Sequence, residues 1–304
     1  MRFSAQHVEQ WREEGFVVLE RFFDKDEYEP VLQDLEQLYH DSNGGGSALP
    51  LKDMQDARSN RALQFQNIHV LPYEASRAIN LISLHPELIS FARALLGVSE
   101  VRLYQSHTWA KYTGEADYEQ EFHCDYGNHT LLVPSDSHAG RSVDFVLYFT
   151  DVTNEHGALR YVTKPDVLEV LGRPALSAPS EAEQAALRQR ERAVVVPAGS
   201  LVAHGIDTLH RASNLTAPHG RRLSMTVGYK AAGNEQIAFH VWQATRGRSW
   251  HSVLDHASPQ QLECLGIPKP GDPFWTRRTL ALTQSRWPGW DMREYFAACP
   301  DAER

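Results

Sequence analysis

The spacing of apolar residues along the chain changes near residue 100. In the first hundred residues, apolar side chains recur every three or four positions, the period of a helix that buries one face. Ser4 can cap such a helix, Pro86 suits a first helical turn, and Gly15 and Gly97 can end helices. The pattern therefore predicts helices over three segments: "AQHVEQWREE", the stretch that follows Asp24, and "PELISFARALL".

From residue 101 the pattern alternates instead, which indicates strands. The segment "VRLYQSHTWAKY" would place on one face Val101, Leu103, Gln105, His107, Trp109 and Lys111. Further predicted strands are "TLLVP", "SVDFVLYFTDV", "ALRYV", "AVVVP", "SLVAH" and "RLSMTVGYK". Short strands joined by turns such as "NEHG" and "PAGS" are typical of an antiparallel sandwich or barrel. We expect a mainly β domain with flanking helices, of the α+β class.

No linker or internal repeat divides the chain, so we expect one domain over residues 1–304. It would comprise a helical part over about residues 1–100, a β core over about 101–230, and an aromatic-rich tail over 231–304. The tail has no clear period. Because loops over a rigid scaffold commonly carry specificity, we expect it to pack over the barrel mouth and shape substrate access.

The composition of the chain limits the kinds of molecule that it is expected to bind. The net charge is −9 and no run of Lys or Arg occurs, which argues against nucleic-acid binding. No apolar stretch resembles a signal peptide or a membrane span. The three cysteines have no metal-finger spacing and fit a reducing compartment. We expect a cytoplasmic protein that acts on a small molecule, with its oligomeric state left open.

Three His-x-acid triplets occur, at residues 7–9, 85–87 and 123–125, where chance predicts about two. The first two fall on predicted helices, where side chains two apart point about 200° away from each other. His123 and Asp125 instead precede the predicted strand "TLLVP". Side chains two apart on a strand share a face, so both can reach one ion.

An open Fe(II) site needs two histidines and one carboxylate. The third ligand must come from elsewhere, and the segment after residue 197 offers His204, His210 and His219. The next strand begins with Arg221 and Arg222. A guanidinium there would pair with the far carboxylate of a 2-oxo acid chelated by the metal.

Alternation separates the two arginines. It groups Arg221 with the apolar positions of "RLSMTVGYK", which we expect to face the barrel interior, and sends Arg222 toward solvent or a second layer. Cys124 should point away from the metal as a small core residue. Pocket candidates are Gln105 and Lys111 for the cofactor, and His107, Tyr126, Asn128 and His129 for the substrate. A polar edge strand and a hydrogen-bonded turn are the alternatives for these residues.

Several motifs together resemble the phytanoyl-CoA dioxygenase (PhyH) family of Fe(II)- and 2-oxoglutarate-dependent oxygenases. The motifs are the N-terminal "FSAQHVEQWREEGFVVLERFFDKDEYEPVLQDL", "HCD", "DVTNEHGAL" and "PAGSLVAHGIDTLHRASN". The resemblance covers roughly residues 4–230 and implies a double-stranded β-helix, the cupin-like jelly roll. It implies His123, Asp125 and His210 as the Fe(II) ligands, and Arg221 as the 2-oxoglutarate anchor. The sequence departs from the family at Cys124 and where Phe145, Val146 and Leu147 stand in place of a frequent Trp.

The function that the resemblance implies is hydroxylation of a small organic metabolite or natural-product intermediate by O2, with release of succinate and CO2. In related halogenases a small residue replaces the ligating carboxylate, so Asp125 favours hydroxylation, or a related desaturation or cyclisation. Two alternatives stay open. One is a cupin-like metalloenzyme that does not use 2-oxoglutarate, and the other is a non-catalytic binding protein of the same fold.

Overall fold

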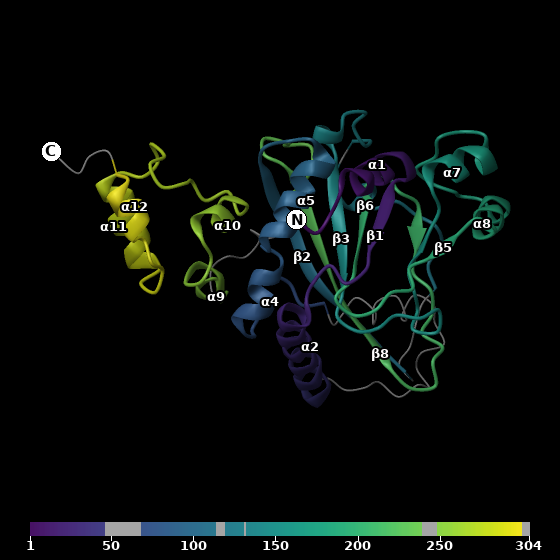
Figure 1. Ribbon diagram of the computed structural model, residues 1–304, viewed down its shortest axis with the longest axis horizontal. Helices are drawn as coiled ribbons and strands as arrows, with labels where there is room; N and C mark the ends of the chain where they lie inside the picture. The colour runs from purple at the N-terminus through teal and green to yellow at the C-terminus, as the bar shows by residue number, and fades with distance from the viewer. Residues whose placement is uncertain (46–67, 114–118, 131, 239–247, 300–304) are drawn as a thin grey trace.

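The computed structural model describes residues 1–45, 68–113, 119–130, 132–238 and 248–299. Antiparallel strands form its centre, with helices on one side of the main sheet and the C-terminal helices at one end (Figure 1). This arrangement confirms the predicted α+β class. Among the described residues, no helix is both long enough and apolar enough to cross a membrane.

The N-terminal helices begin and end where the sequence predicts. Helix α1 (Ala5–Glu14) is capped by the Ser4 side chain and ends at Gly15, whose φ of 91° suits glycine. Helix α5 (Pro86–Leu96) has His85 at its cap and ends at Gly97 with φ 67°. The other elements that the structure describes in this part are β1 (Phe16–Leu19), α2 (Lys25–Gly45) and α4 (Arg77–Ile82).

Two antiparallel sheets follow. The larger has the order β1-β6-β3-β8-β2 and the smaller the order β5-β4-β7. Besides β1, the large sheet contains the strands β2 (Val101–Tyr112), β3 (Ser142–Tyr148), β6 (Leu201–Gly205) and β8 (Arg221–Ala231). The small sheet comprises β4 (Arg160–Tyr161), β5 (Arg192–Ala193) and β7 (His210–Arg211). The connections carry α6 (Tyr126–His129), the 3-10 helix η2 (His138–Gly140), α7 (Lys164–Leu171) and α8 (Glu181–Arg188).

One predicted strand does not form. The described residues of "TLLVP" are irregular, and Leu132 and Val133 are 58% and 69% exposed. The run follows directly after α6, and no strand among the described residues pairs with it, so its apolar pattern alone does not make a strand.

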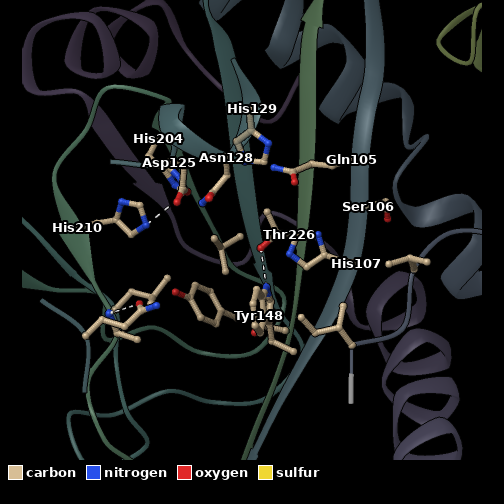
Figure 2. Close-up of a pocket in the computed structure, with 18 of the residues that line it drawn as sticks. Gln105, Ser106, His107, Asp125, Asn128, His129, Tyr148, His204, His210 and Thr226 are labelled. Carbon is tan, nitrogen blue, oxygen red and sulfur yellow. Dashed lines mark hydrogen bonds and ion pairs between the residues drawn. The ribbon is translucent and has the colours of Figure 1, made fainter. Parts of the chain in front are cut away.

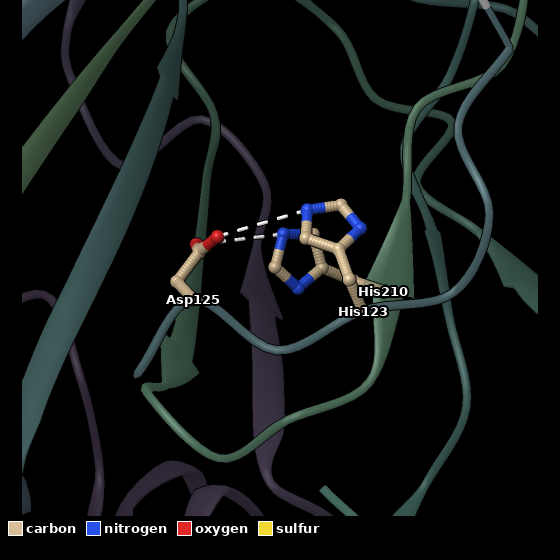
Figure 3. Close-up of side chains that lie close together, drawn as sticks. All are labelled: His123, Asp125 and His210. Carbon is tan, nitrogen blue, oxygen red and sulfur yellow. Dashed lines mark ion pairs between the residues drawn. The ribbon is translucent and has the colours of Figure 1, made fainter. Parts of the chain in front are cut away.

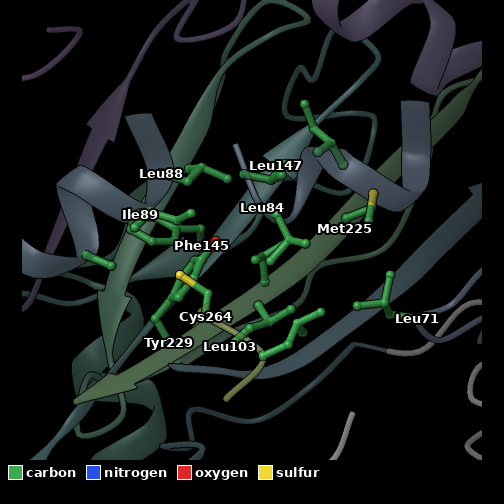
Figure 4. Close-up of a cluster of buried hydrophobic side chains, with 14 of the residues drawn as sticks. Leu71, Leu84, Leu88, Ile89, Leu103, Phe145, Leu147, Met225, Tyr229 and Cys264 are labelled. Atoms are coloured by element: carbon green, nitrogen blue, oxygen red, sulfur yellow. The ribbon is translucent and has the colours of Figure 1, made fainter. Parts of the chain in front are cut away.

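The large sheet buries both of its faces. The face that carries Phe145, Met225 and Tyr229 packs against the helices, in the cluster of Figure 4. The opposite face carries Val146, Tyr148 and Val202, which pack with Tyr161 of the small sheet. This apolar cluster and the pocket described below both lie on this inner face, between the two sheets.

The predicted orientation of the β8 arginines is therefore wrong. Its apolar residues face the helices, and Arg221 projects to the surface, where it pairs with Glu36. Arg222 is only 5% exposed and lines the inner pocket. Alternation correctly places the two arginines on opposite faces of β8. However, the apolar face of the strand packs against the helices, and its polar face lines the pocket between the sheets.

Strand β2 changes face partway along. A β-bulge shifts its register against β8 between Leu103 and Gln105, so that Leu103 pairs with Tyr229 and Gln105 with Gly228. Val101 and Leu103 consequently lie in the core beneath the helices, while Gln105, His107 and Trp109 line the pocket. The bulge breaks the single face that strict alternation predicts.

The tail forms α9 (His251–Leu254), α10 (Pro259–Glu263), α11 (Arg277–Arg286) and α12 (Arg293–Ala297). It attaches at the free edge of β2, where the Leu103 amide donates to the Cys264 carbonyl at 2.7 Å. Trp250, Trp275 and Trp290 are buried in the outer core and do not line the pocket. The prediction that these tail aromatics lie over the barrel mouth is therefore wrong. Arg248, at the start of the described tail, does line the pocket. Trp242 lies outside the described residues.

Candidate metal centre and pocket

His123 and His210 are brought together by backbone pairing. The amide of each donates to the carbonyl of the other at 3.0 Å, which makes them a hydrogen-bonded antiparallel pair. Residues that face each other in this way project side chains to the same side of the sheet. The two imidazole centroids are accordingly 4.7 Å apart.

Asp125 reaches the same point through a turn and not along a strand. Its φ of −78° and ψ of −9° are helical values, and it precedes α6. Its Oδ2 lies 3.5 Å from Nε2 of His210, and its Oδ1 lies 3.7 Å from Nε2 of His123 (Figure 3). One ligand atom from each residue falls within 4.8 Å of the other two. The predicted pair therefore converges, although the predicted local structure is wrong.

The hydrogen bonds of the two histidines fix the form that a metal requires. Nδ1 of His123 lies 2.9 Å from the Glu121 carbonyl oxygen, and Nδ1 of His210 lies 3.1 Å from that of Thr208. A carbonyl oxygen only accepts, so Nδ1 carries the proton and the Nε2 lone pair faces Asp125. Outer partners of this kind typically orient metal-binding histidines.

The charge states are also those of a ligand set. Burial lowers the pKa of His210 to about 3, which keeps the imidazole neutral at physiological pH. Burial alone raises the pKa of Asp125, but the adjacent His210 and His204 outweigh burial and hold this pKa well below its usual value, so the carboxylate stays ionised. Neutral imidazoles and an ionised carboxylate are the protonation states that bind divalent metals.

A third imidazole, that of His204, borders the cluster. It lies on the inner face of β6 with 2% of its surface exposed. Its Nε2 is 3.5 Å from Asp125 Oδ2, and its Nδ1 is 3.0 Å from the Tyr161 hydroxyl. Sequence reasoning considered His204 only as a rival third ligand; the structure places it behind Asp125.

The cluster opens into a cavity of about 660 Å³, within the size range of small-molecule sites. Figure 2 shows Asp125, His204 and His210 at one side of it, and His107 opposite. Of the predicted pocket residues, those that line the cavity are Gln105, His107, Asn128 and His129. Residues that sequence reasoning missed are Gln120, Tyr148, Arg222, Ser224, Thr226 and Arg248. The alternating polar positions of β8 were the available signal for three of them.

Three predicted pocket residues lie elsewhere. Lys111 is buried, but its ammonium donates to the Ser213 carbonyl at 2.9 Å and does not line the cavity. Tyr126 packs against Ile206 and Ile237, because α6 turns its first residue toward the core. Arg221 points to the surface. Cys124 is buried in an apolar cluster, as predicted.

Gln105 belongs to a buried polar network beside the cavity. Its Nε2 donates to Asp144 at 2.6 Å, and the Tyr104 hydroxyl donates to the same carboxylate at 2.7 Å. Burial raises the pKa of Asp144. Gly228 leaves the space for this network, because a Cβ there would lie 2.4 Å from an Asp144 oxygen.

Two facing antiparallel sheets with a His/Asp/His cluster at one end define the class of metal-dependent oxygenases built on a double-stranded β-helix. The family model for phytanoyl-CoA dioxygenase (PhyH) matches residues 11–223. The chain therefore belongs to the phytanoyl-CoA dioxygenase family and is an Fe/2-oxoglutarate-dependent oxygenase, an oxidoreductase. A comparison with curated proteins found no match.

Solved structures support the fold. EctD from S. alaskensis, solved with 2-oxoglutarate and 5-hydroxyectoine, has a TM-score of 0.58 and 18% identity over 77% of this chain and 78% of its own. The epimerase SnoN from nogalamycin biosynthesis has a TM-score of 0.53 and 18% identity over 75% and 82%. The carbocyclase SnoK, from the same biosynthesis, has a TM-score of 0.52 and 20% identity over 76% and 85%. At these identities the likeness establishes the fold alone.

Proposed function

We propose that this protein hydroxylates a small organic metabolite or natural-product intermediate, using Fe(II), 2-oxoglutarate and O2 and releasing succinate and CO2. The observation that carries the proposal is the convergence of His123, Asp125 and His210. Their Nε2 and carboxylate atoms meet in one place, with both histidines held in the metal-binding tautomer. Two histidines and one carboxylate with open positions are the ligand set of non-haem Fe(II) oxygenases.

The bound iron would supply the redox chemistry, in which O2 oxidatively decarboxylates 2-oxoglutarate and the substrate is oxidised in turn. His123, Asp125 and His210 would hold it. The protein's own contribution is to position the ligands and to line the cavity beside them. Hydroxylation is preferred to halogenation because Asp125 supplies a carboxylate that would ligate the metal, where a halogenase needs a small residue to admit a halide.

Arg222 is the residue that we assign to the far carboxylate of 2-oxoglutarate. It is buried in the pocket, and one guanidinium nitrogen donates to the Gly157 carbonyl, which holds the fork in place. Tyr148 lines the same region, and its buried hydroxyl has no hydrogen-bond partner within the described part of the chain. A guanidinium and a free hydroxyl donor together suit a carboxylate.

The rest of the lining supports a small substrate. His107, Asn128 and His129 offer hydrogen-bonding groups, and Trp109 and Val70 offer apolar surface. Small-molecule sites commonly combine an apolar wall with a few placed polar groups. SnoN and SnoK come from nogalamycin biosynthesis, and EctD was solved with 5-hydroxyectoine, which is in keeping with a small-molecule substrate here.

Succinate formation and O2 uptake by the Fe(II)-loaded protein, with and without 2-oxoglutarate, test this function. We expect slow 2-oxoglutarate-dependent uptake without substrate, and faster uptake when a screen of small metabolites supplies the correct one. His210→Ala should abolish both. O2 uptake that is independent of 2-oxoglutarate would favour a cupin-like metalloenzyme, and the absence of any turnover or metal binding would favour a non-catalytic binding protein.

A further inference from the structure

His204 is a buried histidine that the ligand set does not use. It is 2% exposed, and its Nε2 has no hydrogen-bond partner within the part of the chain that the structure describes. The nearest charged atom is Asp125 Oδ2 at 3.5 Å, a distance too long for a well-formed hydrogen bond. A buried N–H that lacks a partner costs about 1–3 kcal/mol, so a donor left beside a metal-site carboxylate calls for a functional explanation.

Tyr161 determines how His204 is used. Its hydroxyl lies 3.0 Å from His204 Nδ1 and is fully buried. If the hydroxyl donates to Nδ1, the proton of the neutral imidazole must sit on Nε2, the atom that faces Asp125. The opposite tautomer would set a lone pair of Nε2 against an ionised carboxylate, and His204 lies outside the ligand set, so no bound cation would bridge the two atoms as it would at His123 and His210. The tautomer is thus inferred from the two neighbours.

Tyr161 also contacts a metal-binding candidate directly. It pairs with His210 across β4 and β7, and the two rings stack with centroids 5.4 Å apart and planes 21° apart. One tyrosine therefore supports the His210 ring with its face and the His204 ring with its hydroxyl. Tyr161 therefore lies behind the proposed ligand His210, and His204 lies behind the proposed ligand Asp125.

We propose that His204 is a positioning residue that donates from Nε2 to the Asp125 carboxylate, and that Tyr161 holds His204 in the donating tautomer. The proposal rests on the metal site of the proposed function. The hydrogen bond would leave one carboxylate oxygen to the metal and restrain the other. Outer partners of metal ligands typically contribute 10–100-fold to metal affinity, which sets the effect to expect.

Titration of the metal-free full-length protein with Co(II) alone, a redox-stable probe, tests the proposal without turnover. His204→Leu removes the donor and should weaken Co(II) binding by about 10–100-fold. His204→Gln retains an N–H near the Nε2 position and should recover most of that loss. Tyr161→Phe should weaken binding to a smaller extent. Tyr73→Phe is a matched control, because it removes a buried hydroxyl that bonds to Ser106, on the opposite side of the cavity from His210.

Thermal unfolding of each variant separates a folding defect from a metal-binding defect. If His204→Leu does not fold, the comparison of Tyr161→Phe with Tyr73→Phe decides the question. Unchanged Co(II) affinity in the folded His204 or Tyr161 variants would overturn the inference. A visible Co(II) spectrum that loses a nitrogen ligand in both His204 variants would overturn it too, because His204 would then be a ligand. Absence of Co(II) binding to the wild type would overturn the proposed metal site itself.

Discussion

Replacing Arg222 with alanine removes a guanidinium that is 5% exposed and lies on the pocket face of β8. Loss of one partner of a buried, hydrogen-bonded charge pair costs about 2–5 kcal/mol. At 1.4 kcal/mol per tenfold change, this corresponds to a loss of at least about 30-fold in affinity for 2-oxoglutarate. Arg222→Lys should recover part of it, since it keeps the charge but not the two-pronged donor.

Arg221→Ala is the matched control, one residue away on the same strand. Arg221 pairs with Glu36 at the surface, where the two side chains are 43% and 41% exposed. Exposed pairs contribute about 0–1 kcal/mol to stability, and this pair lies on the other face of the sheet from the pocket. Titration of 2-oxoglutarate into anaerobic Fe(II)-loaded protein compares the variants. Equal losses, or a larger loss for Arg221→Ala, would refute the assignment of Arg222.

Two further predictions concern the framework. Burial raises the pKa of Glu27, but its hydrogen bonds from Arg2 and the Asp24 amide outweigh this and lower the pKa to about 2 from a usual value of 4.5. A lowered carboxyl pKa stabilises the fold above pH 4.5, by at most about 3 kcal/mol, and the effect is lost as the pH falls toward 2. Glu27→Gln should therefore lower the free energy of unfolding at pH 7 and much less at pH 3, as urea denaturation can measure; the same loss at both pH values would contradict the linkage. Gly228→Ala should lower that free energy by about 1–3 kcal/mol, because its Cβ would overlap Asp144 and Tyr104, and an unchanged urea midpoint would show that the network has room to spare.

Local signals in the sequence were sufficient for the helices. Ser4, Gly15 and Gly97 act through their own backbone neighbours, so the ends of α1 and α5 are predictable from a few residues. The β8 orientation was not predictable in this way. Both faces of that strand are buried, and alternation cannot say which face meets the helices and which meets the interior.

The candidate site shows the same division. The residue types of His123, Asp125 and His210 are visible in the sequence, and the structure brings them together. The means of doing so is a cross-strand pair and a turn, which depend on chain segments more than eighty residues apart. Long-range pairing of this kind also explains why His204 could be recognised only as another histidine, and not as a neighbour of the Asp125 carboxylate.

The central claim is that His123, Asp125 and His210 bind Fe(II) and that Arg222 binds 2-oxoglutarate. The most direct test is a crystal structure from crystals grown without oxygen in the presence of Fe(II) and 2-oxoglutarate. We expect an anomalous iron peak within bonding distance of His123 Nε2, His210 Nε2 and one Asp125 oxygen. We also expect 2-oxoglutarate to reach from the metal to the Arg222 guanidinium. An ion bound by His204 in place of His210, or a 2-oxoglutarate carboxylate that lies away from Arg222, would contradict the account.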